Sequence, residues 1–226
     1  MTVQNFMQFD IITIFPKIFD SYFSESILKR AQAKKKIKIN MHNLRDFTTD
    51  KHHHVDDRPY GGGPGMILLV EPMYKAIKAI KKKRKSRVIM LAPEGKLLTQ
   101  KEAKRLSKYD QLVLLCGRYE GFDARVEQFI DEKISIGQYV LAGGELPAMV
   151  VTEAVARHVP GVVGHKDALA EETFGGDLDY IEYPQYSRPE AFKPAGKKGL
   201  TVPPILLSGN HAKIRQWRQL KSGKKR

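Results

Sequence analysis

Two near-continuous apolar runs, Arg87–Ala92 (RVIMLA) and Gln111–Cys116 (QLVLLC), constrain this chain most. Uninterrupted runs of this length are typical of strands that a parallel sheet buries on both faces. Parallel neighbours need a crossover connection, which is usually a helix. Between the runs, Thr99 stands three residues before Glu102 in a capping-box pattern, which predicts a helix to about Lys108.

The same alternation of strand and helix patterns extends over most of the chain. Strand patterns cover Phe9–Phe15, Ile37–Leu44 and Lys133–Ile136. Helical spacing covers Ile18–Ala31, Glu71–Arg84 and Phe122–Ile130, a further helix opens at Pro147 and ends near His158, and Asn210 caps a final one. This order predicts an α/β fold.

The charge balance points to a polyanionic partner. The 226 residues hold 39 Lys plus Arg against 25 Asp plus Glu, a net charge of +14, and 42% hydrophobic residues exclude a disordered polycation. After Glu190 the sequence has basic residues and no acidic one, and two more basic runs occupy Lys34–Lys36 and Lys81–Lys85. Solvated helix ends would explain one such run, but three together favour nucleic acid.

Two absences narrow the location and the chemistry. The sequence shows neither a membrane span nor a secretory signal, so we predict a cytoplasmic protein. Its one cysteine, Cys116, excludes an internal disulfide and a cysteine-rich metal site. Cys116 ends an apolar run without an activating partner at motif spacing, so we interpret it as a buried strand residue rather than a nucleophile.

Three loops rich in glycine and proline follow the predicted strands: Pro93–Lys96, Gly117–Gly121 and Gly137–Pro147. Carboxyl ends of strands form the ligand crevice of an open α/β sheet, so the loops are expected to share one pocket. Bare glycine backbone allows close approach to a ligand. Tight turns needed only for folding are the alternative for each loop alone. None matches a dinucleotide fingerprint or a Walker loop, which disfavours a standard dinucleotide enzyme.

The segment Arg45–Met66 mixes both signs of charge with four glycines. Its three consecutive histidines point alternately apart in extended chain and have no second cluster, so we predict no metal site. We interpret the segment as a flexible loop whose Arg45, Lys51 and Arg58 meet phosphates while Tyr60 or the glycine backbone meets a base. A solvated surface loop is the alternative.

Six motifs carry a resemblance to one family. They are DDRPYGGGPGM (Asp56–Met66), CGRYEG (Cys116–Gly121), IGQYVLAGGELPAM (Ile136–Met149), RHVPGVVG (Arg157–Gly164), YSRPE (Tyr186–Glu190) and VPPILLSGNH (Val202–His211). Together, and in this order, they resemble the bacterial tRNA (guanine-N1)-methyltransferase family of the SPOUT class. The resemblance runs from about Met7 to Trp217.

The resemblance implies a fold, a cofactor and partners. The fold is a SPOUT-type α/β methyltransferase domain with a deep C-terminal trefoil knot, here residues 1–160. A mobile active-site loop at 161–189 follows, then a short, basic, truncated C-terminal helical tail at 190–226. The implied enzyme is a homodimer with its active site at the subunit interface. It uses S-adenosyl-L-methionine, with Mg²⁺ as a candidate activity requirement, to methylate N1 of the tRNA guanine immediately 3′ of the anticodon.

The resemblance also assigns positions to the two ligands. Cofactor-binding positions fall on Leu91, Pro93, Gly117, Tyr119, Glu120, Ile136, Gly137, Gln138, Tyr139, Val140, Leu141, Gly143, Gly144 and Pro147. Substrate-binding positions fall on Arg45, Asp57, Arg58, Pro59, Tyr60 and Gly61.

Guanine N1 carries a proton at neutral pH, so its methylation needs a base for that proton and a cation for the charge that builds on O6. By motif position the family's acid and arginine fall on Glu172 and Arg157. The family usually has aspartate where this chain has Glu172, and the extra methylene moves the carboxylate by about 1 Å or more. Asp177 is the fallback base.

Further departures leave alternatives open. Ala142 stands where a serine is common and Glu94 where a glutamine is common, and the chain stops where the family continues into a larger helical domain. One alternative function is a SPOUT-type RNA-binding protein that has lost catalysis. The other is a SPOUT methyltransferase that acts on a different RNA nucleoside.

Overall fold

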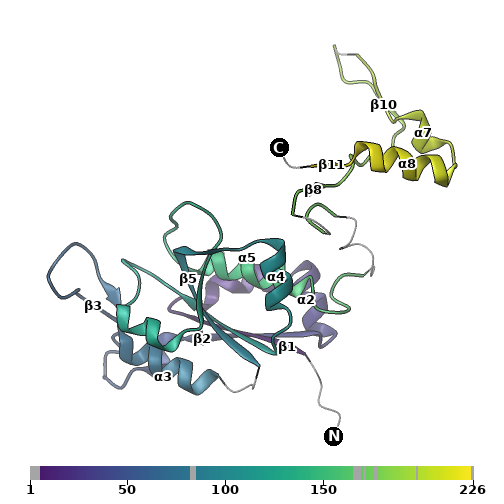
Figure 1. Ribbon diagram of the computed structural model, residues 1–226. Coiled ribbons are helices and arrows are strands. Elements are labelled where there is room, and N and C mark those ends of the chain that lie inside the picture. Colours follow the sequence, from purple (N-terminus) through teal and green to yellow (C-terminus); the bar gives the residue numbers. More distant parts are fainter. Residues whose placement is uncertain are drawn as a thin grey trace, which may run out of the picture. The chain divides into compact units, whose positions relative to one another are not determined.

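The computed structural model describes residues 6–81, 85–164, 169, 172–175, 178–196 and 198–224. The chain divides into two compact units, Met1–Lys166 and Asp167–Arg226. The first unit holds a central parallel sheet with helices on both faces (Figure 1). The finer division into an active-site loop at 161–189 and a basic region at 190–226 stays a prediction.

Five strands form the central sheet, in the order β2-β1-β6-β5-β7. Each neighbouring pair is parallel, and Ile11 of β1 lies opposite Met41 of β2 on one side and Leu114 of β6 on the other. Crossover helices therefore join the strands, as the apolar runs predict. The strands are β1 (Met7–Thr13), β2 (Ile37–Asn43), β5 (Ser86–Leu97), β6 (Gln111–Cys116) and β7 (Glu132–Ser135).

A hydrophobic core lies on each face of the sheet. Helices α1 (Asp20–Phe23), α2 (Ser26–Ala33), α4 (Gln100–Leu106) and α5 (Glu145–Ala156) supply the first, and α3 (Val70–Ile80) with the 3₁₀ helices η2 (Leu44–Phe47) and η3 (Ala124–Phe129) supplies the second. Alternate residues of β1 serve the two faces, since Phe9 and Ile11 belong to the first core and Ile12 to the second. The mixed α/β prediction is thus confirmed.

Two predicted helices differ from the structure. The expected single helix over Ile18–Ala31 is split into η1 (Pro16–Phe19), α1 and α2, because Glu25 adopts extended backbone with φ −126° and ψ 165°. The expected helix over Phe122–Ile130 is the 3₁₀ helix η3. The capping box at the start of α4 is confirmed, since the Thr99 side chain accepts a hydrogen bond from the Glu102 amide.

Strand β5 is longer than the apolar run suggests and pairs with β7 twice. Leu91 lies opposite Ile134, and after a shift of register Lys96 lies opposite the same residue. The chain between them, residues 92–95, therefore leaves the regular ladder as a bulged arm. A Cβ on Gly95 would lie 2.6 Å from the Ile134 amide nitrogen, so only glycine fits this close approach.

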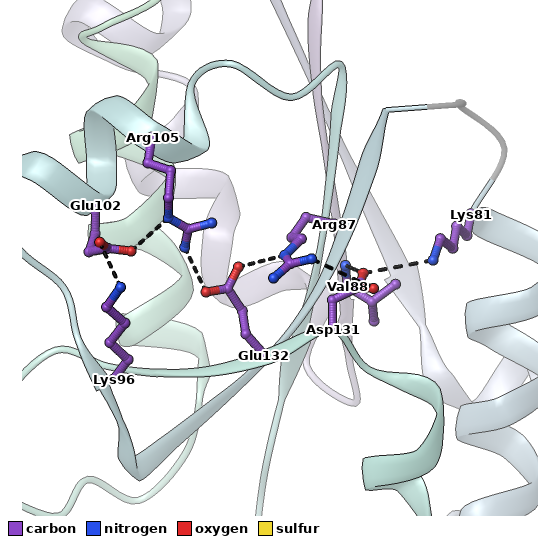
Figure 2. Close-up of polar contacts among 8 residues, drawn as sticks. All are labelled: Lys81, Arg87, Val88, Lys96, Glu102, Arg105, Asp131 and Glu132. Atoms are coloured by element: carbon purple, nitrogen blue, oxygen red, sulfur yellow. Dashed lines mark hydrogen bonds and ion pairs between the residues drawn. The ribbon is translucent and has the colours of Figure 1, made fainter.

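A chain of ion pairs joins α4 to β5 and β7 (Figure 2). Glu102 contacts Lys96 Nζ and Arg105 Nε, each at 2.8 Å. Glu132, which is only 14% exposed, contacts Arg105 Nη2 at 2.6 Å and Arg87 Nε at 2.7 Å. Lys96, which follows the bulged arm, thus connects the end of β5 to α4. Glu132 connects the start of β7 to both α4 and β5.

The second unit is built from short elements. Strand β8 (Tyr180–Ile181) pairs antiparallel with β11 (Gly223–Lys224), and β9 (Ala191–Phe192) pairs with β10 (Leu200–Thr201). Helix α7 (Pro204–Leu207) precedes α8 (His211–Lys221), which Asn210 caps by accepting a hydrogen bond from the Lys213 amide at 3.1 Å. Within the described ranges, no helix is both long and apolar enough to span a membrane.

Candidate functional site: a cavity formed by three loops

A cavity of about 360 Å³ opens at the carboxyl ends of β6 and β7, beside the stretch of β5 that leaves the ladder after Leu91. Two of the predicted loops, Gly117–Gly121 and Gly137–Pro147, follow β6 and β7 and supply much of its wall. The third, Pro93–Lys96, is not a loop after a strand, because it lies inside β5, and its Pro93 and Glu94 line the cavity from the bulged stretch of that strand. Of the fourteen positions that the resemblance assigns to the cofactor, all but Gln138 line it. They are Leu91, Pro93, Gly117, Tyr119, Glu120, Ile136, Gly137, Tyr139, Val140, Leu141, Gly143, Gly144 and Pro147.

Two of the loops touch through backbone at Gly144. Its amide donates a hydrogen bond to the Gly117 carbonyl at 2.9 Å. A Cβ on Gly144 would lie 2.6 Å from Cys116 Cα and 2.8 Å from the Gly117 nitrogen. Because both neighbours are backbone atoms, no side-chain movement relieves the clash, and the close packing of the loop after β7 on the loop after β6 requires glycine here.

A buried ion pair anchors the start of α5 beside the cavity. Glu145, 2% exposed, contacts Arg118 Nε at 2.9 Å and accepts a hydrogen bond from Thr13 Oγ1 at 2.7 Å. The Arg118 guanidinium also lies over the Phe15 ring, 4.8 Å from its centroid. These contacts join β1, the residue two positions after β6 and α5, so they hold the α5 end of the glycine loop in place.

The cavity also carries a charged cluster, of which the sequence analysis singles out Glu94 but neither Lys133 nor Glu127. Lys133 Nζ contacts Glu94 Oε1 at 3.0 Å and Glu127 Oε1 at 2.7 Å, and all three residues line the cavity. A hydrogen bond to its own backbone amide and then the Lys133 ammonium hold the pKa of Glu94 below its usual value. Lys133 and Glu94 come together where β5 shifts its register against β7, and no local sequence motif predicts this ion pair.

Tyr119 connects the cavity to the segment Arg45–Met66. Burial, together with a hydrogen bond to Asp56, raises the pKa of the Tyr119 phenol. The next residue, Glu120, donates its amide proton to the Met66 carbonyl at 3.0 Å. The segment that is expected to meet RNA therefore ends against the cavity wall.

The predicted substrate residues are spread along that segment. Arg45 lies in η2, where its Nη1 donates to the His53 carbonyl at 3.1 Å. Asp57 lies in β3 (Asp56–Asp57), which pairs with β4 (Ile67–Leu68). The remaining four, Arg58, Pro59, Tyr60 and Gly61, form the tip that follows, where the Tyr60 side chain is 99% exposed.

The three histidines of the segment follow a turn in which the Asp50 carboxylate accepts hydrogen bonds from backbone amides. His54 Nδ1 lies 2.7 Å from Asp50 Oδ2, and the backbone amides of His52 and His54 also donate to this carboxylate. Among the described residues, no group of three or more histidine, cysteine, aspartate or glutamate side chains is placed to hold a metal ion.

The two expected catalytic residues belong to different units. Arg157 is the C-cap of α5, whereas the cavity touches the first turn of this helix at Pro147. From Pro147 to Arg157 the α-helix rises about 15 Å, so Arg157 lies far along the helix from the cavity of its own chain. Glu172 belongs to the second unit, where its carbonyl accepts a hydrogen bond from the Gly175 amide. Asp177 lies outside the described residues.

Comparison with known proteins decides the family. A family model described as tRNA (Guanine-1)-methyltransferase TrmD matches residues 7–226. The chain belongs to this family. A relative from Dictyoglomus turgidum named tRNA (guanine-N(1)-)-methyltransferase is 53% identical over 97% of this chain and 86% of its own length. Relatives of the same name from Caldanaerobacter subterraneus subsp. tengcongensis and Staphylococcus carnosus are 51% and 46% identical, over 96% and 94% of this chain and 87% and 84% of theirs.

For a member of this methyltransferase family, the cavity offers a recess lined by glycine, apolar and charged residues together. Ala142 and Glu94, the two departures noted in the sequence, both line it. Arg118, Phe122 and Lys133 also line it, although the sequence patterns did not nominate them. Arg118 could have been proposed from the sequence, because it lies within the motif CGRYEG. Its ion pair with Glu145 could not, because the two residues are distant in sequence and only the folded structure brings them together.

Proposed function

We propose that this chain transfers a methyl group from S-adenosyl-L-methionine to N1 of the tRNA guanine immediately 3′ of the anticodon. Membership of the family makes it a tRNA (guanine-N1)-methyltransferase, which is a transferase that modifies tRNA. The observation that carries the proposal further is the convergence on one cavity of the loops after β6 and β7 and the bulged stretch of β5. Because tRNA is the substrate, we place the enzyme in the cytoplasm.

The residues of the cavity fit S-adenosyl-L-methionine. Apolar positions such as Leu91 and Pro93 on one wall and Leu141 on another suit an adenine ring, and glycine backbone at Gly117 and Gly144 leaves its amides and carbonyls within reach of polar edges. The bound cofactor supplies a methyl group on a positively charged sulfonium, which Glu94 and Glu120 on the wall complement. The described residues offer no metal cluster, so no step is assigned to Mg²⁺, which stays an expected activity requirement.

The target guanine is assigned to the segment that ends against Tyr119. Arg45 and Arg58 supply charge for phosphates, and the exposed Tyr60 offers a ring face on which an unstacked base can lie. Asp57, Pro59 and Gly61 shape the same tip. Because the anticodon loop is single-stranded, exposing the base costs less than extrusion from a duplex.

Two side chains carry the chemistry in this proposal. The Glu172 carboxylate accepts the proton from N1 as the N1–CH₃ bond forms, and the Arg157 guanidinium offsets the negative charge that builds on O6. The positive charge of the sulfonium is lost as its methyl group leaves, so charge balances over the step.

A second copy of the chain completes the site in this proposal. Arg157 is about 15 Å along α5 from Pro147 at the cavity, so an arginine from a partner subunit is needed there. The chain also exposes an apolar face that such a partner would cover, with Phe15 43%, Tyr22 45%, Leu146 57% and Val150 45% exposed. We therefore propose a homodimer with its active site at the subunit interface.

The family's deep trefoil knot is also proposed for this chain. After β7, at the edge of the sheet, the chain returns to the end of β6, where Gly143 bridges Arg118 and Gly144 bonds to Gly117. The chain then continues from Gly144 into α5. An experimental structure would contradict the knot if its backbone, pulled from both termini, straightened without forming a knot.

Nucleoside analysis tests the function directly. The enzyme is incubated with total tRNA and a cofactor that carries an isotopically labelled methyl group, and the digested RNA is analysed by mass spectrometry. We expect label in N1-methylguanosine, and none with a tRNA that lacks guanine 3′ of the anticodon. Label in another nucleoside would favour the alternative methyltransferase, and absence of both transfer and cofactor binding would favour a non-catalytic RNA-binding protein.

Glu172→Gln tests the base, because it keeps the size of the side chain and removes its proton affinity. We expect kcat to fall about 10²- to 10⁴-fold while the calorimetric Kd for the cofactor stays unchanged. Glu190→Gln, an exposed residue of the same unit, is the matched control and should keep full activity. Unchanged turnover in Glu172→Gln would remove this residue from the mechanism.

A further inference from the structure

The second unit contains a cavity of its own, apart from the three-loop cavity. Its volume is about 660 Å³, within the range of about 300–1,000 Å³ typical of ligand pockets. One wall is the segment Tyr180–Tyr186 and the other is α8. Every residue that lines it belongs to this unit, including Tyr183, Tyr186, Trp217 and Arg218.

Aromatic rings and a guanidinium hold the two walls together. The Tyr186 and Trp217 rings lie 6.4 Å apart, tilted by 58°, and the Arg218 guanidinium lies 4.8 Å from the centroid of the Tyr183 ring. At the other end, the hydroxyls of Tyr180 and Ser222 are 3.2 Å apart. The rings therefore occupy defined positions, and the Tyr186 side chain stays 48% exposed at the rim.

The charged residues that line this cavity, Arg215 and Arg218, are cationic, although the wall segment Tyr180–Tyr186 also carries Glu182, whose Oε1 accepts a hydrogen bond from Gln185 Nε2. Helix α8 carries Lys213, Arg215, Arg218 and Lys221 and no acidic residue, and no acidic residue follows Glu190 in the sequence. Such a helix, which buries none of its residues fully, favours a polyanion over an apolar partner.

Rings at the rim with cations around them are the two components of single-strand nucleic-acid sites, because bases stack on the rings while phosphates meet the cations. We propose that this aromatic cavity binds an unpaired nucleotide of RNA, with its base against Tyr186 and Trp217 and its phosphates near Arg215 and Arg218. The inference deepens the proposed function, since it gives the second unit a contact of its own with the RNA substrate.

Trp217 allows a direct test, because it is the only tryptophan in the chain. The full-length protein is titrated with a short oligouridylate, which has unstacked bases, while tryptophan fluorescence is recorded. We expect saturable quenching, and none with inorganic polyphosphate, which offers charge without bases. Equal quenching by both polymers would show that the cavity binds charge without recognising bases, which contradicts the proposal. Absence of quenching by the oligonucleotide would also contradict it.

Two variants keep the fluorophore and separate stacking from charge. Tyr186→Ala removes one ring and should weaken oligonucleotide binding about 5- to 150-fold, the range for the loss of one base–aromatic stack. Arg218→Gln should lower the slope of log affinity against log salt by about 0.7, as expected for one phosphate contact on a single strand. Leu220→Ala, on the same helix but outside the cavity lining, should bind like the unchanged protein.

Failure of the RNA-binding proposal for this cavity can be distinguished from failure of the proposed methyltransferase function. Intact methyl transfer without oligonucleotide-dependent quenching would overturn the inference alone. Intact quenching without formation of N1-methylguanosine would overturn the proposed function alone. If a protein rather than RNA occupies the cavity, Tyr186→Ala will leave oligonucleotide affinity unchanged, and this result also overturns the inference.

Discussion

Single residues at the cavity are constrained more by backbone contacts than by side-chain chemistry. Gly144 is the clearest case, because its missing Cβ leaves space for Cys116 Cα and the Gly117 amide nitrogen. A side chain there must displace one loop from another, and both loops line the cavity.

We predict that Gly144→Ala lowers the free energy of unfolding by about 1–3 kcal/mol, the usual cost of overpacking, and weakens cofactor binding. Thermal unfolding and calorimetry measure the two effects. Gly164→Ala is the matched control, since a Cβ at Gly164 meets nothing within 4 Å. Similar unfolding temperatures for the two variants would contradict the role of this close approach.

At the residue scale, the sequence predicted which glycines lie together, whereas their role in cofactor binding stays a prediction. Glycines such as Gly117 and Gly144 are visible in a sequence, and strand order places them on one edge. The ion pairs Arg118–Glu145 and Lys133–Glu94 were not foreseen, because each joins elements that only the folded sheet brings together. No sequence spacing encodes such pairs.

At the scale of elements, three strands share one buried carboxylate. Asp10 of β1 accepts hydrogen bonds from Asn40 on β2 and Gln111 on β6, and His42 Nε2 lies 2.8 Å from its Oδ1. Burial alone would raise the pKa of Asp10, but the hydrogen bonds from His42, Gln111, Asn40 and Gln8 outweigh it and lower the pKa below 3.8.

This shift has a defined sign. A carboxylate with a lowered pKa stabilises the folded state above its unfolded-state pKa, and that contribution is lost as pH falls below about 4. We predict that Asp10→Asn costs about 1–3 kcal/mol of unfolding free energy at pH 7, and that the cost shrinks in acid. Urea unfolding across pH measures it, with the exposed Asp20→Asn as control. A cost that is independent of pH would contradict the assignment.

The ion-pair chain of Figure 2 gives a second prediction for elements. Glu132→Gln removes one charge that two arginines contact, and we expect a loss of about 1–3 kcal/mol together with faster hydrogen exchange in β7. Glu71→Gln breaks only the exposed pair with Lys75, so its effect should stay within about 0.5 kcal/mol. Equal losses of unfolding free energy in the two variants would show that the ion pairs of Glu132 do not stabilise this edge of the sheet.

Elements were predictable where periodicity is strong. The buried strands β5 and β6 follow from apolar runs, and α4 follows from its cap. The break at Glu25 and the 3₁₀ form of η3 were missed, because helical spacing of apolar residues persists across a local change of backbone. The second pairing of β5 with β7 was missed as well, since Lys96 and Leu97 are not part of the apolar run.

At the scale of the whole molecule, the proposed active site needs two chains. We predict that Arg157→Ala and Gly144→Ala are each nearly inactive alone but regain activity when their subunits are unfolded and reassembled together. Random pairing leaves one intact site in each mixed dimer, so about a quarter of full activity is expected. Methyl transfer measures it, with each variant reassembled alone as control. No recovery from mixed dimers would contradict a shared site.

Cys116 has a consequence for how this protein can be observed. It is the one thiol of the chain, it lies behind the glycine crossing of two cavity loops, and burial raises its pKa well above the ordinary value. An alkylating reagent can therefore react only when those loops separate. The rate of labelling of the unaltered enzyme would then report how often the crossing opens, and a cofactor that clamps the loops would slow it.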